Sequence, residues 1–375
     1  MSRATYDVVV VGAGIVGAAC AGELAGRGLH VAVVERDCVG GGATAAGMGH
    51  IVVMSDSEPQ FALTRYSQLL WRDLSPELPS DVEYQPCGTI WVAADEEEMG
   101  EVRRKDAYYR ERAVPAEVID GTTLARLEPN LRKGLVGGLL VPEDAVLYPP
   151  CAARCLMELA QAKGAELHLG LSVSRIGQGR VFAGSREFSA GTIVNAAGAW
   201  ASELMPEVEV TRRKGHLVIT DRYPGFVGHA LVELGYLKSV HALTSDSVAF
   251  NVQPRITGQI LVGSSRQYRA EATNVDSEIL ARMLRRAQQY MPGLGELSAI
   301  RTWTGHRAAT RDRLPYIGPW PDDKTIYLAT GHEGLGITTS LGTGYLLADQ
   351  LTGTKPRIPI EPYLPARIDA EHIHA

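Results

Sequence analysis

The chain has 375 residues, of which 45% are hydrophobic and 21% are charged. These proportions are ordinary for a globular protein and exclude a disordered chain, a collagen-like repeat and a disulfide scaffold. Lys and Arg number 37 against 43 Asp and Glu, so the formal charge is −6, and this acidic balance argues against general binding of nucleic acid. At about 150 residues per domain, the length predicts two or three domains.

Cysteine usage and hydropathy indicate the cellular compartment. The five cysteines have irregular spacing and form no C-x-x-C pair, so the sequence predicts neither a metal site nor an iron–sulfur cluster. No stretch approaches the roughly 20 apolar residues of a membrane-spanning helix, and the start of the chain has no signal peptide of the usual form. Because such a chain suits a reducing compartment, we expect a cytoplasmic protein without a transmembrane segment.

The first predicted elements form a strand–helix–strand unit. Residues 6–11 (YDVVVV) predict a buried strand, residues 15–27 a helix with an apolar stripe, and residues 30–34 a second strand. A stretch of small residues follows at 40–49 (GGGATAAGMG), where a nicotinamide dehydrogenase would usually continue with another strand–helix repeat. We expect this stretch to wrap closely around a large, flat cofactor.

The turn of this unit has the spacing G-x-G-x-x-G. Gly12 permits a tight turn, Gly14 lets a pyrophosphate approach the backbone, and Gly17 lets the helix and strand pack closely. The helix N-terminus favours the phosphates, and Glu35 can accept hydrogen bonds from a ribose diol. The pattern predicts a dinucleotide and leaves NAD and FAD open. Glu35 disfavours NADP, while Arg36 beside it keeps that alternative open.

Later segments add further strand and helix patterns. Residues 89–93 (TIWVA) and 259–264 (QILVGS) are strand-like, and residues 277–290 (SEILARMLRRAQQY) predict a helix that stops at Pro292. Residues 192–200 (TIVNAAGAW) predict a buried strand that breaks into small residues.

The C-terminal part repeats the strand–glycine–helix arrangement. From residue 326 a strand leads into three glycines and then a helix to about residue 351, which Gly353 ends. This arrangement offers a second helix N-terminus to a polar cofactor edge, and it favours FAD over NAD.

Together, these segments resemble the FAD-dependent D-amino-acid oxidase and glycine oxidase superfamily, which includes sarcosine oxidase and D-amino-acid dehydrogenase. They look most similar to the catalytic beta subunits of D-hydroxyproline dehydrogenase and opine oxidase. The similarity extends from the start to the end of the chain. The segments that carry it are 8–36, GATAAGM at 42–48, VNAAGAW at 194–200, WTGHRAATRDRLPYIG at 303–318 and GHEGLGITTSLGTGYLLADQLTG at 331–353.

The resemblance implies an α/β fold with two domains. A Rossmann-type FAD-binding domain is expected from the discontinuous segments 1–80, 145–210 and 305–375. A mixed-sheet α+β substrate domain is expected from 81–144 and 211–304.

The resemblance also implies FAD and the residues that bind it. Sarcosine oxidase relatives attach FAD to a cysteine shortly before the final glycine-rich motif, but residues 310–329 contain no cysteine, so we expect non-covalent FAD. The implied cofactor-binding residues are Gly12, Gly14, Ile15, Val16, Gly17, Glu35, Arg36, Ala43, Thr44, Gly47, Met48, Val173, Ala196, Ala197, Gly198, Trp200, Gly305, Arg307, Gly334, Leu335, Gly336, Ile337 and Thr338.

Flavin-dependent amine oxidation requires a substrate whose Cα–H faces flavin N5 and whose carboxylate is held still, because orientation supplies much of the rate. An arginine suits this task, since its planar fork binds a carboxylate with two parallel hydrogen bonds. The position of Arg307 in WTGHR matches the family's carboxylate-binding arginine. His306 is its strand neighbour, so we expect its side chain to point the other way.

Three further residues are catalytic candidates by resemblance. Met48 corresponds to a flavin-lining residue of glycine oxidase relatives, while His332 and Glu333 lie in the final glycine turn near the flavin or substrate. Glu333 is a candidate to receive a cationic amine or a substrate hydroxyl. Gly334 stands where glycine oxidase relatives carry an arginine, so a second carboxylate contact from that position is absent. Lid candidates are Tyr236, Tyr268 and Trp303.

The predicted function is FAD-dependent oxidation of an amino or imino acid to the imine by hydride transfer, with D-hydroxyproline as the first substrate. The alternatives are opine oxidation and glycine- or sarcosine-type amine oxidation. From other classes, an NAD-dependent dehydrogenase and a non-catalytic scaffold subunit remain. The resemblance implies partner redox subunits carrying FMN or iron–sulfur centres, and peripheral contact with the inner membrane through an electron acceptor.

Overall fold

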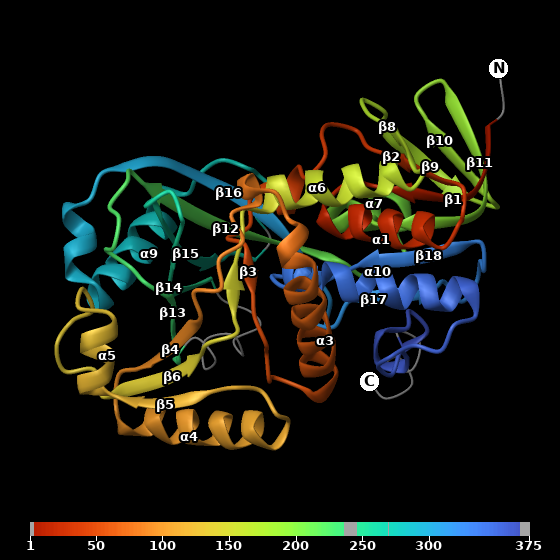
Figure 1. Cartoon of the computed structure of the whole chain (residues 1–375). Helices are drawn as coiled ribbons and strands as arrows, with labels where there is room; N and C mark the ends of the chain where they lie inside the picture. The colour runs from red at the N-terminus through yellow and green to blue at the C-terminus, as the bar shows by residue number, and fades with distance from the viewer. Residues whose placement is uncertain (1–3, 236–245, 269, 368–375) are drawn as a thin grey trace.

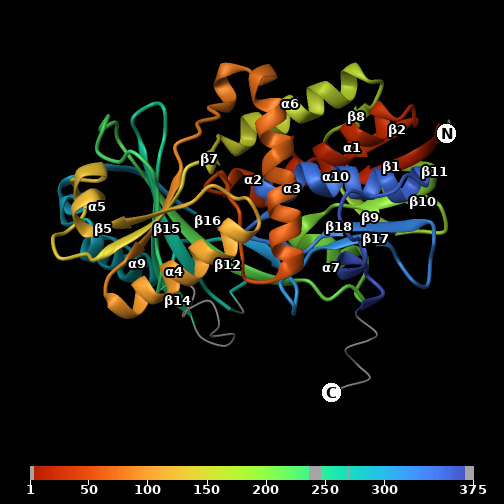
Figure 2. The same cartoon turned by 60° about the horizontal axis from the view of Figure 1, so that its bottom comes forward.

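The structure is a computed structural model that describes residues 4–235, 246–268 and 270–367. Its strands form two large sheets that lie side by side (Figure 1). Helix α3 (Glu58–Leu74) stands between them in both views (Figure 2). This mixture of strands and helices confirms the predicted α/β class.

The first sheet has the order β17-β18-β11-β1-β2-β8. Neighbours from β18 to β8 are parallel, and β17 is antiparallel to β18. The valines of the first two strands are buried on both faces, as expected inside a parallel sheet. The strand bounds are β1 (Ala4–Val11), β2 (Val31–Val34), β8 (Glu166–His168), β11 (Arg186–Asn195), β17 (Tyr316–Pro319), β18 (Ile326–Thr330), and the attached antiparallel β9 (Val173–Gly177) and β10 (Arg180–Ala183).

Small residues let the helices beside this sheet pack closely. A Cβ atom at Gly344 would lie 2.8 Å from the carbonyl oxygen of Ala19, and one at Gly342 would lie 2.3 Å from Ser67 Oγ. Helix α10 therefore lies tightly against both α1 and α3. Within the described ranges, no helix has the length and apolar character to cross a membrane. The bounds are α1 (Ile15–Gly26), α6 (Pro149–Ala162), α7 (Ala201–Leu204) and α10 (Gly336–Thr352).

The second sheet has the order β19-β16-β12-β15-β14-β13-β4-β6-β5. It is mixed, because β13 is parallel to β4 whereas the other pairs are antiparallel. Helix α9 packs on β14 and β15, and α4 packs at the far end on β4, β5 and β6 (Figure 1). The bounds are β4 (Thr89–Ala93), β5 (Glu117–Asp120), β6 (Gly137–Val141), β12 (Thr211–Thr220), β13 (Ala230–Glu233), β14 (Ser247–Pro254), β15 (Ile260–Arg266), β16 (Ala299–Ala309), β19 (His332–Glu333), α4 (Glu96–Glu111), α5 (Gly121–Leu127) and α9 (Ser277–Tyr290).

One predicted domain boundary does not coincide with the division of the strands between the two sheets. The boundary placed at residue 305 falls inside β16, which continues in the second sheet to Ala309. Strand β19 lies in the segment 305–375 but joins the same second sheet by pairing with β16. The physical reason is that ten residues of β12 need a partner along their whole length. The substrate side of the molecule therefore includes residues beyond 304.

Short elements join the two sheets. Strand β3 (His50–Ile51) pairs with β7 (Ala145–Val146), and the small-residue stretch at 40–49 contains the one-turn helix α2 (Gly42–Ala45). The remaining turns are the 3-10 segments η1 (Ser75–Glu77), η2 (Ser80–Val82), η3 (Gly198–Trp200), η4 (Pro292–Glu296) and η5 (Glu361–Tyr363).

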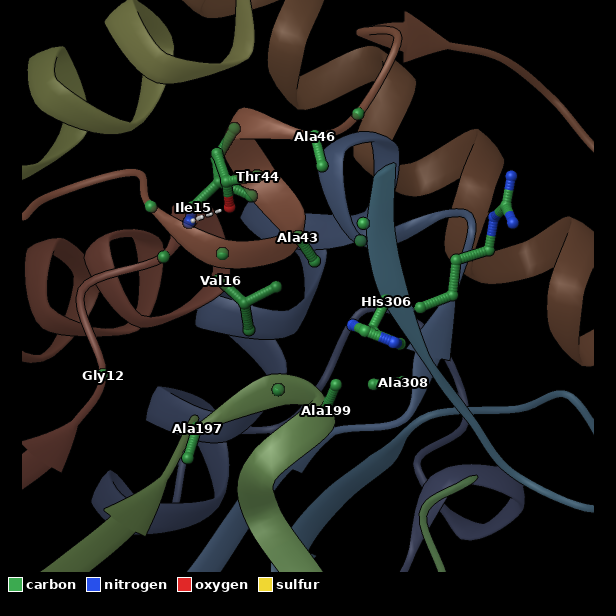
Figure 3. Close-up of a pocket in the computed structure, with 18 of the residues that line it drawn as sticks. Gly12, Ile15, Val16, Ala43, Thr44, Ala46, Ala197, Ala199, His306 and Ala308 are labelled. Atoms are coloured by element: carbon green, nitrogen blue, oxygen red, sulfur yellow. Dashed lines mark hydrogen bonds between the residues drawn. The ribbon is translucent and has the colours of Figure 1, made fainter. Parts of the chain in front are cut away.

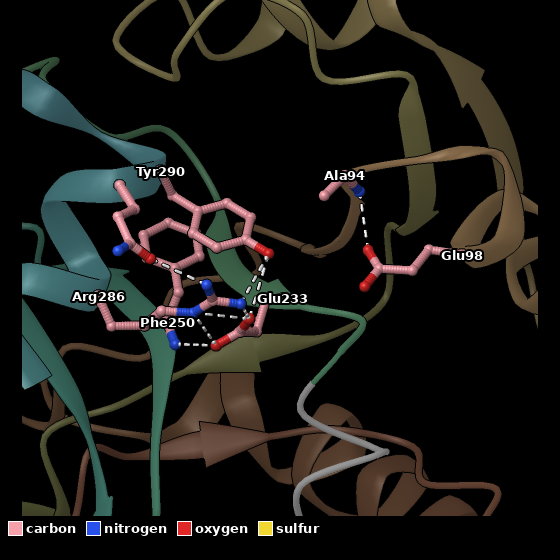
Figure 4. A network of polar contacts seen from close by, with 7 residues as sticks. Ala94, Glu98, Glu233, Phe250, Arg286 and Tyr290 are labelled. Atoms are coloured by element: carbon pink, nitrogen blue, oxygen red, sulfur yellow. Dashed lines mark hydrogen bonds and ion pairs between the residues drawn. The ribbon is translucent and has the colours of Figure 1, made fainter.

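A buried carboxylate fixes α9 to the second sheet (Figure 4). Glu233 is 2% exposed at the end of β13. It accepts hydrogen bonds from the backbone N–H of Phe250 at 2.5 Å and from the Tyr290 hydroxyl at 3.1 Å. The guanidinium of Arg286 forms an ion pair with the same carboxylate. One side chain thus joins β13, β14 and α9.

Replacing this carboxylate should destabilise the fold. In Glu233→Ala, the Phe250 N–H, the Tyr290 hydroxyl and the Arg286 guanidinium lose their shared acceptor. We expect the free energy of unfolding to fall by about 3 kcal/mol, measured as a lower midpoint in urea. Glu296→Ala removes an exposed carboxylate and serves as the control; equal midpoints for the two variants would contradict the role given to Glu233.

Candidate active site

A pocket of about 330 Å³ lies between the two sheets. The ends of β1, β2 and β11 form one side of it, and residues of β12, β14, β15 and β16 form the other. A volume of this size is typical of a small-molecule site. The pocket brings together every predicted cofactor-binding and catalytic residue except Gly17, Leu335 and Thr338.

These three residues do not line the pocket, but each contacts a residue that does. A Cβ atom at Gly17 would lie 2.0 Å from the carbonyl oxygen of Gly12, so this glycine serves close helix–strand packing. Leu335 precedes α10, and its N–H donates to the carbonyl of His332. The Thr338 hydroxyl donates to the carbonyl of His50 at 2.8 Å.

Glycines keep the pocket open where side chains would fill it. A Cβ atom at Gly305 would lie 2.2 Å from the Ala46 Cβ, and one at Gly47 would lie 2.6 Å from Ile337 Cδ1. Gly12 has a φ of +105°, a conformation that glycine adopts readily. This cradle of backbone atoms suits a flat, extended cofactor such as FAD.

The N-terminus of α1 faces this cradle (Figure 3). Its cap residue, Gly14, has no side chain to cover the first-turn N–H groups, and the first turn contains no acidic residue. Thr44 Oγ1 accepts the N–H of Ile15 at 3.1 Å. A helix terminus of this kind favours a phosphate group, so its chemistry fits the pyrophosphate of a dinucleotide.

Glu35 is held in a fixed orientation at the end of β2. One carboxylate oxygen accepts the N–H of Ala13 at 2.8 Å, and the other accepts the N–H of Asp37 at 2.8 Å. Each oxygen keeps a second lone pair that can accept a ribose hydroxyl. Nearby, the guanidinium of Arg36 lies 4.3 Å from the centre of the Trp200 ring, which closes the same end of the pocket.

Arg307 and Met48 lie at the other end. The Nη1 of Arg307 donates to the carbonyl oxygen of Ser265 at 2.9 Å. A Cβ atom at Gly215 would lie 2.4 Å from this Nη1, so a side chain there would displace the guanidinium. Met48 packs in an apolar cluster with Leu217. This part of the pocket therefore combines the anchored guanidinium of Arg307 with the apolar side chains of Met48 and Leu217.

His306 and His332 both line the pocket, and both form hydrogen bonds with other groups of the protein. His306 is 5% exposed, and its Nε2–H donates to the carbonyl of Ala270 at 2.9 Å. Thr343 donates its own hydroxyl proton to a backbone carbonyl, so His332 Nε2–H donates to Thr343 Oγ1 at 2.9 Å. Burial lowers the pKa of His332 to about 3, and this imidazole is neutral near pH 7.

Glu333 has a different environment from the one expected from the sequence. Its Oε1 lies 2.8 Å from Arg213 Nη1 and 3.7 Å from Arg266 Nε. The side chains of Glu333 and Arg213 are each 9% exposed. Glu333 therefore balances the charge of protein arginines. Its contact with a substrate amine or hydroxyl stays a prediction.

The sequence reasoning assigned no role to three polar residues of the pocket wall. His50 lies on β3, and Asn251 and Ser264 lie in strands whose sequence gives no sign of a site. Burial lowers the pKa of His50 to about 4, against the opposing effect of hydrogen bonding with the Asn251 side chain. The pairing of β14 with β15 brings Asn251 and Ser264 together, and His50 joins them from a distant part of the chain.

Two of the three lid candidates lie outside the pocket lining. Trp303 packs with the apolar cluster around Met48, and Tyr268 lies 5.1 Å from the Arg213 guanidinium; neither lines the pocket. Tyr236 is outside the described residues. No cysteine lines the pocket, and the described part of the chain contains no cluster of side chains that could hold a metal ion.

Comparison with known proteins agrees with this geometry. The family model DAO, described as FAD dependent oxidoreductase, matches residues 7–350. Hydrogen cyanide synthase subunit HcnC of Pseudomonas aeruginosa is 30% identical over 421 residues, which cover 98% of this chain and 97% of that protein. Glycine oxidase of Geobacillus kaustophilus is 27% identical over 370 residues, or 96% of each chain.

Solved structures have the same fold. The crystal structure of the Geobacillus kaustophilus glycine oxidase superposes with a TM-score of 0.86 at 26% identity, covering 96% of this chain and 98% of that one. L-proline dehydrogenase from P. horikoshii superposes with a TM-score of 0.88 at 24% identity, covering 99% of both chains.

The chain therefore belongs to the DAO family of FAD-dependent oxidoreductases. This membership confirms the family and the FAD cofactor predicted from the sequence.

Loss of the Glu35 carboxylate should weaken FAD binding. In Glu35→Ala, the ribose loses its acceptor and the Ala13 and Asp37 N–H groups lose theirs. We expect the Kd for FAD to rise at least about tenfold, measured by flavin fluorescence on reconstitution of the apoprotein. Glu158→Ala removes an exposed carboxylate on α6 as a control, and an unchanged Kd in Glu35→Ala would contradict the assigned contact.

Burial of His332 should make the protein sensitive to acid. The folded-state pKa of about 3 is below the ordinary 6.5, so the unfolded state binds the proton more readily and stability is lost as pH falls from 6.5 towards 3. We expect His332→Gln to lessen the fall in melting temperature over this range at saturating FAD. His30→Gln, at an exposed histidine, is the control, and an unchanged slope in His332→Gln would overturn the prediction.

Proposed function

We propose that the protein oxidises an amino or imino acid to the imine, with D-hydroxyproline as the first candidate. The observation that carries the proposal is the placement of Arg307 at the end of a pocket suited to FAD, beside Met48 and a floor of glycines. The relatives named glycine oxidase and L-proline dehydrogenase support a substrate of this class.

The side chains of the pocket orient the substrate. Arg307 is anchored through the Ser265 carbonyl, and a guanidinium is the side chain that can hold a carboxylate as a planar fork. Gly215 and Gly305 leave room for the Arg307 guanidinium and for Ala46 at this wall of the pocket. In the reaction the Cα–H bond breaks and its hydrogen leaves as a hydride with both bonding electrons, the amine nitrogen releases a proton to solvent, and a C=N bond forms. Bound FAD would supply the two-electron acceptor for the hydride.

A substrate with a second carboxylate, such as an opine, has less support. Gly334 offers no side chain where glycine oxidase relatives carry an arginine, and Arg213 already pairs with Glu333 at 2.8 Å. These features favour a monocarboxylate over an opine. Glycine- and sarcosine-type amines remain the second candidates, because Arg307 would hold their carboxylate in the same way.

The electron acceptor belongs to the same proposal. The similarity to catalytic subunits of multi-subunit dehydrogenases supports a partner that carries FMN or an iron–sulfur centre. Such a complex would bring the chain to the inner membrane only through its acceptor. A scaffold role is less well supported, since the pocket keeps both Arg307 and the glycine cradle.

An anaerobic spectral titration tests the reaction. Purified, FAD-loaded protein is mixed with a panel of D- and L-amino acids, 4-hydroxyprolines, sarcosine and opines while the visible flavin bands are recorded. Bleaching by one class identifies the substrate, and the speed at which air restores the colour separates an oxidase from a dehydrogenase. If no member of the panel bleaches the flavin, the proposed function is wrong.

Arg307→Ala should impair oxidation of any substrate found in this way. Loss of a charged, two-point contact predicts a fall in kcat/KM of about 100-fold or more, with a higher KM. Steady-state kinetics with an artificial acceptor measure the effect. Arg301→Ala removes an exposed arginine from the same strand, and it should behave as wild type. Similar kinetics for both variants would refute the role of Arg307.

A further inference from the structure

One wall of the pocket contains three buried polar atoms without a partner. His50 Nε2, Asn251 Oδ1 and Ser264 Oγ make no hydrogen bond of good geometry among the described residues, and all three residues line the pocket. The Asn251 side chain lies close enough to His50 to raise its pKa. Ser264 is 4% exposed. A buried polar group without a partner costs about 1–3 kcal/mol, and native proteins keep few of them. A group of three on the wall of one pocket therefore points to a ligand that supplies the missing partners.

This wall lies directly beside the carboxylate-binding group. Arg307 Nη1 donates to the carbonyl of Ser265, the residue that follows Ser264, and both Arg307 and Ser264 line the pocket. Asn251 pairs in register with Gly263 on the neighbouring strand. His50 enters from β3, two residues after Met48, whose carbonyl accepts a hydrogen bond from the Gln253 side chain at 2.8 Å. A small amino acid held by Arg307 would be within reach of this wall.

The chemistry of the wall favours a neutral polar group. Serine and asparagine side chains are uncharged, and His50 is neutral near pH 7 because burial lowers its pKa to about 4. Together they offer both donors and acceptors. A second carboxylate would need a cation here, but the nearby Arg213 pairs with Glu333. A hydroxyl group, which donates one hydrogen bond and accepts others, matches the available atoms.

We propose that Asn251 and Ser264, together with His50, bind a neutral hydroxyl on the substrate and so make the enzyme selective for a hydroxylated amino or imino acid. This inference rests on the proposed amino acid oxidation. It assigns the choice among substrates to the wall of β14 and β15, whereas Arg307 holds the carboxylate that all amino acids share.

The test compares cis-4-hydroxy-D-proline with D-proline in FAD-loaded protein. We expect wild-type kcat/KM to favour the hydroxylated compound by at least about tenfold. Ser264→Ala and Asn251→Leu should reduce this ratio at least threefold, mainly by slowing the hydroxylated substrate. Ser264→Thr keeps a hydroxyl and should retain more of the preference than Ser264→Ala. The control is Ser247→Ala, which removes a hydroxyl from β14 outside the pocket and should leave the ratio unchanged.

The outcomes separate this inference from the proposed function. Equal kcat/KM for the two prolines in wild type, or an equal loss of both substrates in the wall variants, overturns the hydroxyl site while amino acid oxidation stands. Absence of flavin bleaching by the whole amino acid panel overturns the proposed function itself. Flavin content and melting temperature are measured for each variant, so a misfolded protein is not scored as a change in selectivity.

Discussion

The pairing of Gly215 with Gly305 across β12 and β16 is the constraint on which the site depends. A side chain at Gly305 would collide with Ala46, and one at Gly215 would collide with the guanidinium of Arg307. Two long strands thus place a gap in their side-chain layer where the second sheet meets the loop after β2. The absence of side chains at this register position leaves room for the Arg307 guanidinium and for Ala46. A slip of one residue would instead place Thr304 or His306 opposite Gly215.

Electrostatics around Arg307 follow from the same register. Arg213 is its direct partner across the strands, and like charges in this arrangement repel. Glu333 approaches from β19 and pairs with Arg213 at 2.8 Å, so the charge that would oppose Arg307 is largely balanced. This explains why Glu333 is buried beside the site, and why the turn before α10 is tied to the second sheet.

The sequence predicted those parts of the fold that are encoded locally. Strand 89–93 and helix 277–290 have the bounds expected from their patterns, and the glycine turns lie where their spacing placed them. Helix α4 was not predicted, because its few apolar residues are separated by charged ones. The partnership of Glu333 with Arg213 could not be predicted, since it joins segments far apart in the sequence. The wall of Asn251 and Ser264 could not be predicted either, because it depends on how β14 and β15 pair and on which face they turn to the pocket.

Recognition in this pocket is divided between two kinds of contact. A carboxylate clamp contributes the same free energy to every amino acid, so Arg307 can raise affinity and fix orientation without choosing among substrates. Selection requires a group whose partner is present in one substrate and missing in another. Buried, unpartnered polar atoms meet this requirement, because a substrate that lacks the matching group leaves their desolvation uncompensated. The wall beside Arg307 is thus the part of the pocket where a change of one or two side chains would alter specificity and leave the cofactor cradle intact.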